Sequence, residues 1–210
     1  MKTKKIISII CAVAILLTLT LNFQTPVFAQ TPNLRFGAIS DVHITSSDGT
    51  CEGARYFKKT LEYYKTRGVD AILIAGDITD SGQDYQTKTI ANVFNEVFKD
   101  QSTRPQKIFV PGNHDRYNGK TFDKMQSDFA SFLGEENGAY IHKVINGYDF
   151  IGISHGGNVT TLKNFVKNAI AEAIKRDPNK PIFFTQHEHL PNTVYGSEDW
   201  SDGTLYDILK

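Results

Sequence analysis

The sequence predicts an α/β fold in which a mostly parallel β-sheet is flanked by helices. Short apolar runs bounded by turn residues recur along the chain, and stretches with helical spacing alternate with them. Neighbouring parallel strands need a crossover of about a dozen residues or more, so this alternation favours a parallel sheet covered by helices. A chain of 210 residues is long enough to enclose the core of one such domain.

The expected strands are the buried apolar runs. They cover residues 34–40, 69–75, 107–110, 148–154 and 181–186. Residues 139–145 form one further strand, which we expect to pair with residues 148–154 as an antiparallel hairpin. The Asn146-Gly147 dipeptide between them is typical of the tight turn of such a hairpin.

The expected helices lie between these strands. In each of them apolar side chains repeat every three or four residues, as Phe165, Ala169 and Ala173 do in the last one. The helices cover residues 54–67, 85–99, 121–133 and 162–176. The sequence contains no internal repeat, low-complexity tract or domain linker, so we expect one domain from residue 30 to residue 210.

The N-terminus has the features of a secretory signal peptide. A lysine-rich start precedes an uncharged run over residues 6–21, and Val27-Phe28-Ala29 suits a signal peptidase. This run is shorter than the ~20 residues that span a bilayer, so we expect cleavage after Ala29 rather than a membrane anchor. The sequence therefore predicts a signal peptide over residues 1–29 and a mature protein that is secreted or otherwise outside the cytoplasm.

Charge and cysteine content limit the possible partners of the mature chain. Without residues 1–29 it has 20 basic and 23 acidic residues, a net charge of about −3 that offers no nucleic-acid-binding patch. Of the two cysteines, Cys11 lies in the predicted signal peptide and only Cys51 remains. An internal disulfide is therefore excluded in the mature chain.

Clusters of polar residues follow four of the expected strands. They are Asp41-Val42-His43, Gly76-Asp77-Ile78-Thr79-Asp80, Gly112-Asn113-His114-Asp115 and Gln186-His187-Glu188-His189. A single carboxylate at a strand end is often only a turn former or a helix N-cap. Four clusters at successive strand ends indicate a site instead, because in such sheets the chemistry gathers beyond the carboxyl ends of the strands.

These residue types suit divalent metal ions. Asp41 and His43 are two residues apart, so in extended backbone their side chains leave on the same side and can converge on one ion. Asp77 can bridge two ions, and Asn113 offers a neutral carbonyl oxygen. Because histidine and asparagine ligands are neutral, a site of this composition keeps positive charge for hydroxide and phosphate.

The order Asp-x-His, Gly-Asp-x-x-Asp, Gly-Asn-His-Asp and a later His resembles that of the calcineurin-like metallophosphoesterases. The resemblance spans about residues 34–209, and its most specific element is Gly-Asn-His-Asp about 35 residues after Gly-Asp. It implies an α/β sandwich of the metallophosphoesterase type, with mostly parallel sheets flanked by helices. It also implies a phosphoester substrate, either a monoester or a diester, attacked in line by a metal-bridging hydroxide.

The resemblance further implies a cofactor and a set of ligands. The cofactor would be two divalent metal ions, for which mixed oxygen and nitrogen ligands accept Mn, Fe, Zn or Co. Asp41 and His43 would bind the first ion, and Asp77 would bridge both ions. Asn113 and His187 would complete the second ion.

The resemblance also assigns the proton chemistry. His114 would stay off the metals and protonate the departing oxygen as general acid. Asp115 directly follows it and would orient or charge-stabilise that histidine, or alternatively serve as a turn former. Asp80 is interpreted as structural, as a helix N-cap or a loop hydrogen-bonding residue.

Two histidines compete for the last ligand position. The family pattern often has this histidine two residues before a proline, which selects His189 before Pro191. His187 directly ends the expected strand, and we favour it, although His189 stays an alternative. We leave His142 and His155 outside the site, because a lone histidine is more often a surface or structural residue.

The sequence departs from the family pattern at one place. The family normally closes with a Gly-His-x-His loop that gives one histidine to each ion, and this motif does not occur here. Residues 204–210 look like the start of the helix that precedes that loop. We therefore expect a domain that is incomplete at its C-terminus and binds ions weakly. The alternative is a non-catalytic or weakly active relative that binds metal or phosphate.

Overall fold

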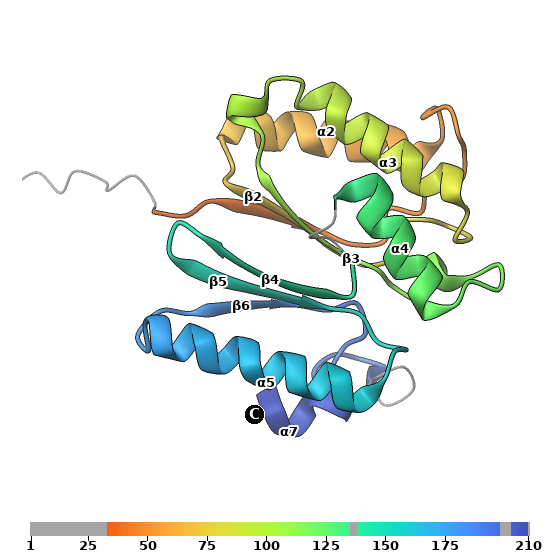
Figure 1. Cartoon of the computed structure of the whole chain (residues 1–210). Coiled ribbons are helices and arrows are strands. Elements are labelled where there is room, and N and C mark those ends of the chain that lie inside the picture. Colours follow the sequence, from red (N-terminus) through yellow and green to blue (C-terminus); the bar gives the residue numbers. More distant parts are fainter. Residues whose placement is uncertain (1–32, 135–137, 198–202, 210) are drawn as a thin grey trace, which may run out of the picture. The chain divides into compact units, whose positions relative to one another are not determined.

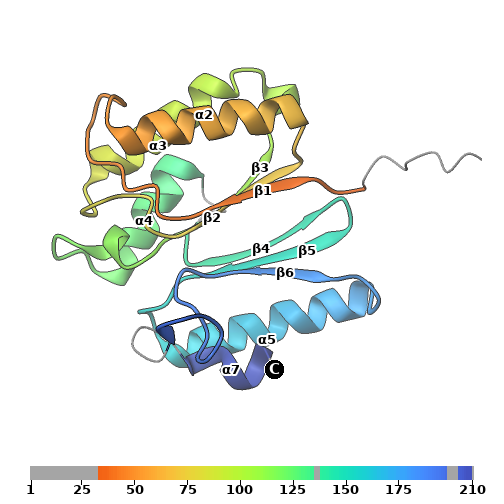
Figure 2. The same cartoon turned by 180° about the vertical axis from the view of Figure 1, so that it is seen from behind.

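Two three-stranded β-sheets form the centre of the computed structural model (Figures 1 and 2). The structure describes residues 33–134, 138–197 and 203–209, and the predicted signal peptide of residues 1–29 lies outside them. The sheets and helices belong to the unit Leu34–Lys210. Among the described residues no helix has the length and apolar character needed to cross a membrane.

The first sheet is entirely parallel. It contains β1 (Phe36–Ile39), β2 (Ala71–Ala75) and β3 (Gln106–Val110), in the order β1-β2-β3. Its helices are α2 (Glu52–Arg67), α3 (Asp84–Val97) and α4 (Phe122–Leu133). In both figures these three helices lie on one face of the sheet. Because all three strands run the same way, the loops that follow them meet at one edge.

The second sheet is mixed. It contains β4 (Tyr140–Ile145), β5 (Tyr148–Ile153) and β6 (Ile182–Thr185), with β4 antiparallel and β6 parallel to β5. The β4–β5 turn places Asn146 at φ 51° and Gly147 at φ 79°, the left-handed backbone that tight hairpin turns require. The crossover from β5 to β6 is α5 (Val159–Arg176), and α7 (Tyr206–Leu209) lies beside it.

The two sheets pack face to face. Leu73, Ile108 and Val110 of the first sheet share a buried cluster with Ile141 and Phe150 of the second. A separate cluster joins the first sheet to α2, α3 and α4, and a third joins β5 to α5. The result is a sandwich of helices, sheet, sheet and helices, in which each sheet has both faces covered.

The predicted fold class is confirmed, and one prediction of strand placement needs correction. Every expected strand and helix forms, with bounds that differ by a few residues. However, β6, which leads to His187, belongs to the second sheet and not to a single sheet with β1, β2 and β3. The β4–β5 hairpin begins this second layer, and α5 then returns the chain parallel to β5.

An ion-pair cluster fixes α5 on the second sheet. Asp149 of β5 accepts hydrogen bonds from Arg176 at the end of α5 and from His142 of β4, the latter at 2.7 Å. Burial by itself raises the pKa of Asp149, but Arg176 and His142 outweigh it and hold the pKa below its usual range. His142 is therefore a structural residue, as the sequence indicated.

We expect Asp149→Asn to lower the free energy of unfolding at pH 7 by about 1 to 3 kcal/mol, because a charged hydrogen-bond partner is lost. The lowered pKa means that the ionised carboxylate stabilises the fold above the usual aspartate pKa of ~3.9. This stabilisation is lost as pH falls through the folded pKa. Urea unfolding from pH 7 downward measures the difference, with exposed Asp207→Asn as control. A difference that grows towards low pH would contradict the assignment.

Candidate metal centre

The loops after β1 and β2 run side by side and have unusual backbone conformations. The amide of Asp41 donates to Gly76 O and that of His43 to Asp77 O, both at 3.1 Å. Asp41, His43 and Asp77 have φ of 54°, 48° and 50°, in the left-handed region that few non-glycine residues adopt, most often Asn, Asp and His. Strain of this kind persists where the surroundings impose it, often at functional sites.

Asp41 and His43 converge for a different reason from the one that the sequence suggested, which was a shared side of an extended backbone. Neither residue is in extended backbone, because both have positive φ. The two side chains nevertheless approach one another, with His43 Nε2 at 3.8 Å from Asp41 Oδ1. His43 Nε2 also lies 4.0 Å from Asp77 Oδ2. The structure therefore brings together the three residues predicted for the first ion.

The residues predicted for the second ion lie closer still. His187 Nε2 is 3.1 Å from Asn113 Oδ1 and 3.3 Å from Asp77 Oδ2. The other ring nitrogen of His187 lies 2.9 Å from Ala75 O, which leaves Nε2 to face the carboxylate and the amide. It is His187, rather than the alternative His189, that contacts Asn113 and Asp77.

Two glycines make room for these ligands. A Cβ atom on Gly112 would lie 2.3 Å from Asp77 Oδ1 and 2.8 Å from His187 Cδ2. A Cβ atom on Gly76 would lie 2.4 Å from His187 Cγ. Because such distances are too short for any side chain, only glycine at both positions lets the strand ends and the histidine approach one another.

Asp77 and His187 perturb one another. Burial acts against charge on both, yet the contact with His187 and the amide of His114 lower the pKa of Asp77. Burial likewise opposes charge on His187, but Asp77 and the Ala75 carbonyl raise its pKa to about 9. The carboxylate thus attracts positive charge, which a proton on His187 supplies here and a divalent cation would supply more strongly.

Asp115 holds the loops rather than the predicted general acid. It is buried, and its carboxylate accepts from the amides of Gly112 and Thr79 at 2.8 Å and of Ile78 at 3.2 Å. Burial raises its pKa, while these hydrogen bonds oppose the change. The carboxylate ties the loop after β2 to the loop after β3. This supports the turn-forming alternative and corrects the prediction that Asp115 acts on the His114 ring.

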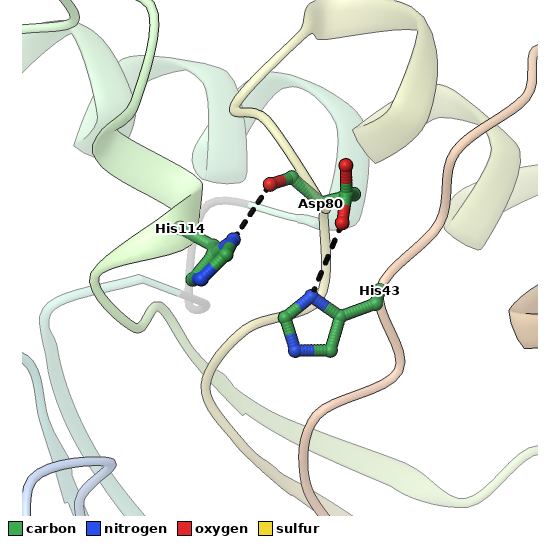
Figure 3. A group of neighbouring side chains, drawn as sticks. All are labelled: His43, Asp80 and His114. Carbon is green, nitrogen blue, oxygen red and sulfur yellow. Dashed lines mark hydrogen bonds and ion pairs between the residues drawn. The ribbon is translucent and has the colours of Figure 1, made fainter.

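Asp80 contacts the ring of His114 and lies close to His43 (Figure 3). Its carbonyl lies 2.6 Å from His114 Nδ1, and its carboxylate lies 3.6 Å from His43 Nδ1. Of the two structural roles considered for Asp80, the N-cap is wrong, because Gln83 caps α3, and the loop hydrogen bond is confirmed by its backbone contacts with Ile44 and His114. The sequence signal was available: a ligating histidine usually has a carboxylate or carbonyl at its second nitrogen, and Asp80 is three residues from Asp77.

His114 faces the same point as the predicted ligands. Its amide donates to Asp77 Oδ1 at 2.9 Å, and its Nε2 lies 4.0 Å from Asp77 Oδ2. Since Asp80 occupies Nδ1, Nε2 is the nitrogen directed into the site. The ring meets that of His43 edge to face, with 4.7 Å between the centroids. His114 thus lies next to the predicted metal ligands, and its side chain stays partly exposed.

Ligand atoms gather at the point where these loops meet. Among the described residues, one atom each of Asp41, Asp77 and His187 lie within 4.8 Å of one another. A cavity of about 570 Å³ opens beside them. It is lined by Ser40, Asp41, Ala75, Asn113, His187, Glu188 and His189.

The family model of the calcineurin-like phosphoesterases matches residues 34–210. The chain belongs to this family. Membership in the calcineurin-like phosphoesterases indicates a metal-dependent phosphoesterase, and candidate metal-binding groups are present at the strand ends. No curated protein matches the sequence. The family assignment made from the motifs is therefore confirmed.

The donor set fits divalent cations of the kind that this phosphoesterase family binds. Carboxylate oxygens, imidazole nitrogens and an amide oxygen point at common positions, in the mixture that Mn, Fe, Zn and Co accept. His43 presents Nε2 to Asp41 and Asp77 while Asp80 lies at its Nδ1. Among the described residues, His43, Asp80 and His114 also form a candidate metal-binding group, in which one atom of each lies within 4.8 Å of the others.

Proposed function

We propose that this calcineurin-like phosphoesterase hydrolyses phosphomonoesters or phosphodiesters by in-line displacement, using two divalent ions. The observation that carries the proposal is the convergence of His187 Nε2 on Asn113 Oδ1 and Asp77 Oδ2, at 3.1 and 3.3 Å. These groups come from three separate loops and two sheets, so packing of the core alone gives no reason for them to meet. A cation bound by all three groups would explain why they meet.

The ligands fall into two groups around one carboxylate. Asp41 and His43 would hold the first ion and Asn113 and His187 the second, with Asp77 between them. Asp77 is 5% exposed in its side chain, while Asp41 is 55% exposed, so the shared ligand is also the more enclosed. When bound, such ions activate water and neutralise the phosphoryl oxygens.

The protein's own groups supply the proton chemistry. His114 would donate a proton from Nε2 to the departing oxygen, and the Asp80 carbonyl would hold its ring through Nδ1. The side chain is 28% exposed, so a phosphoester bound at the metal ligands could reach it. Asp115 would act indirectly, by fixing the loops that carry Asp77 and His114.

Metal removal tests the proposal. Because the sequence predicts weak ion binding, the assay uses excess metal: we expect the protein to hydrolyse bis-p-nitrophenyl phosphate slowly, to lose this activity with EDTA, and to regain it when Mn²⁺, Fe²⁺, Zn²⁺ or Co²⁺ is restored. p-Nitrophenyl phosphate in parallel distinguishes diester from monoester preference. Absence of hydrolysis with all four ions, or activity that EDTA leaves unchanged, would contradict the proposal.

A further inference from the structure

The side-chain amide of Asn113 can take two orientations, and only one of them suits a metal ligand. Only its carbonyl oxygen can ligate a cation, yet the amide is nearly symmetric in shape, so its nitrogen could face the ions equally well. Its own element does not decide the matter, because Asn113 precedes the short 3₁₀ helix His114–Arg116 without a side-chain capping hydrogen bond. The side chain is also exposed. Another residue must therefore fix the amide.

Tyr117 is placed to do so. Its hydroxyl accepts a hydrogen bond from Asn113 Nδ2 at 3.2 Å, on the side opposite the 3.1 Å contact between Asn113 Oδ1 and His187 Nε2. The amide nitrogen is bound to Tyr117 and the amide oxygen lies at His187 Nε2, so the two contacts together hold the carbonyl oxygen towards the ligand group.

The ring of Tyr117 also packs on the proposed general acid. Its centroid lies 4.3 Å from that of His114, with 36° between the ring planes. The position of Tyr117 is itself fixed, since its amide donates to His114 O at 3.1 Å. Its carbonyl packs against Gly82, where a Cβ atom would lie only 2.7 Å away. Tyr117 is thus held firmly although it is 46% exposed.

We propose that Tyr117 is a positioning residue, which holds the Asn113 carbonyl towards the second ion and supports the ring of His114. The inference rests on the proposed function, because it assumes that Asn113 is a metal ligand. Partners of this kind behind a ligand typically contribute about 10- to 100-fold to metal affinity. Since water can replace an exposed hydroxyl in part, we expect an effect near the lower limit.

The test is Mn²⁺ binding to the 210-residue chain, measured by calorimetry on wild type and Tyr117→Phe. We expect Tyr117→Phe to weaken one of two binding steps about 10-fold and to leave the other step and the melting temperature unchanged. The matched control is Tyr63→Phe. The Tyr63 hydroxyl also accepts one side-chain hydrogen bond, from Arg67 Nε at 3.1 Å, but it lies on α2. This variant should bind Mn²⁺ as wild type does.

A double-mutant cycle separates positioning from a general structural effect. In an Asn113→Ala background, Tyr117→Phe should have no further effect on Mn²⁺ affinity, because the amide it acts through is absent. If Tyr117→Phe binds Mn²⁺ like wild type, or weakens binding equally in the Asn113→Ala background, the positioning role is overturned while the proposed function stands. If wild type binds none of Mn²⁺, Fe²⁺, Zn²⁺ and Co²⁺, both fail.

Discussion

Asp77→Asn should weaken the binding of both ions and reduce phosphoesterase turnover by about 10³-fold or more. Asp77 Oδ2 lies 3.3 Å from His187 Nε2 and 4.0 Å from the Nε2 atoms of His43 and His114. Asparagine has nearly the same shape but carries no charge, and of its two terminal atoms only the carbonyl oxygen can ligate a cation. Both ions would therefore lose the shared carboxylate.

Metal analysis of the purified variants measures this effect. Asp41→Asn is the informative comparison, because Asp41 lies at the exposed side of the site, with His43 Nε2 3.8 Å away. We expect it to reduce the occupancy of chiefly one ion, whereas Asp77→Asn should reduce both. Circular dichroism confirms that each variant is folded. Two ions retained by Asp77→Asn would rule out a shared ligand, whatever the activity.

The fold could be predicted from local sequence because its elements are locally consistent. The buried run of β2 and the Asn-Gly turn of the β4–β5 hairpin each favour one conformation, and the helices repeat apolar residues at the helical period. What local patterns did not specify is that β6 lies in a second sheet. A buried parallel strand has a similar run of apolar residues in either sheet. Its own sequence therefore does not show which sheet contains it.

The candidate metal ligands could be predicted from the sequence, but the residues that hold those ligands in place could be predicted less well. Asp77, Asn113 and His187 occupy strand ends, so their convergence follows from the topology. The contact of Asp80 with His114 is made by a backbone carbonyl, which every residue type has, so its side chain gave no signal for it. The proposed role of Tyr117 depends on a hydroxyl contact four residues from Asn113. The sequence left two roles open for Asp115, at His114 or as a turn former, because adjacency in sequence says nothing of side-chain direction. Its carboxylate accepts from the loop amides of Thr79 and Gly112, which favours the second role.

The second large effect concerns His114 and should depend on the substrate. We expect His114→Ala to keep the metal ions and to lose about 10² to 10⁴-fold in turnover of diesters with alkyl leaving groups. Such a leaving group must receive a proton as the ester bond breaks, and Nε2 of His114 is directed into the site while Asp80 holds Nδ1 at 2.6 Å. p-Nitrophenolate is stable without that proton, so its release should slow far less.

Single-turnover rates for a p-nitrophenyl and an alkyl phosphodiester, each with wild type and His114→Ala, separate the two cases. Metal content is measured on the same samples, because an ion lost from the site would slow both substrates alike. His142→Ala serves as the matched control, since His142 belongs to the Asp149 cluster of the second sheet and should leave both rates unchanged. An equal loss on the two substrates with the ions retained would mean that His114 acts on the phosphoryl group rather than on the leaving oxygen. Only a loss confined to the alkyl ester assigns it the proton.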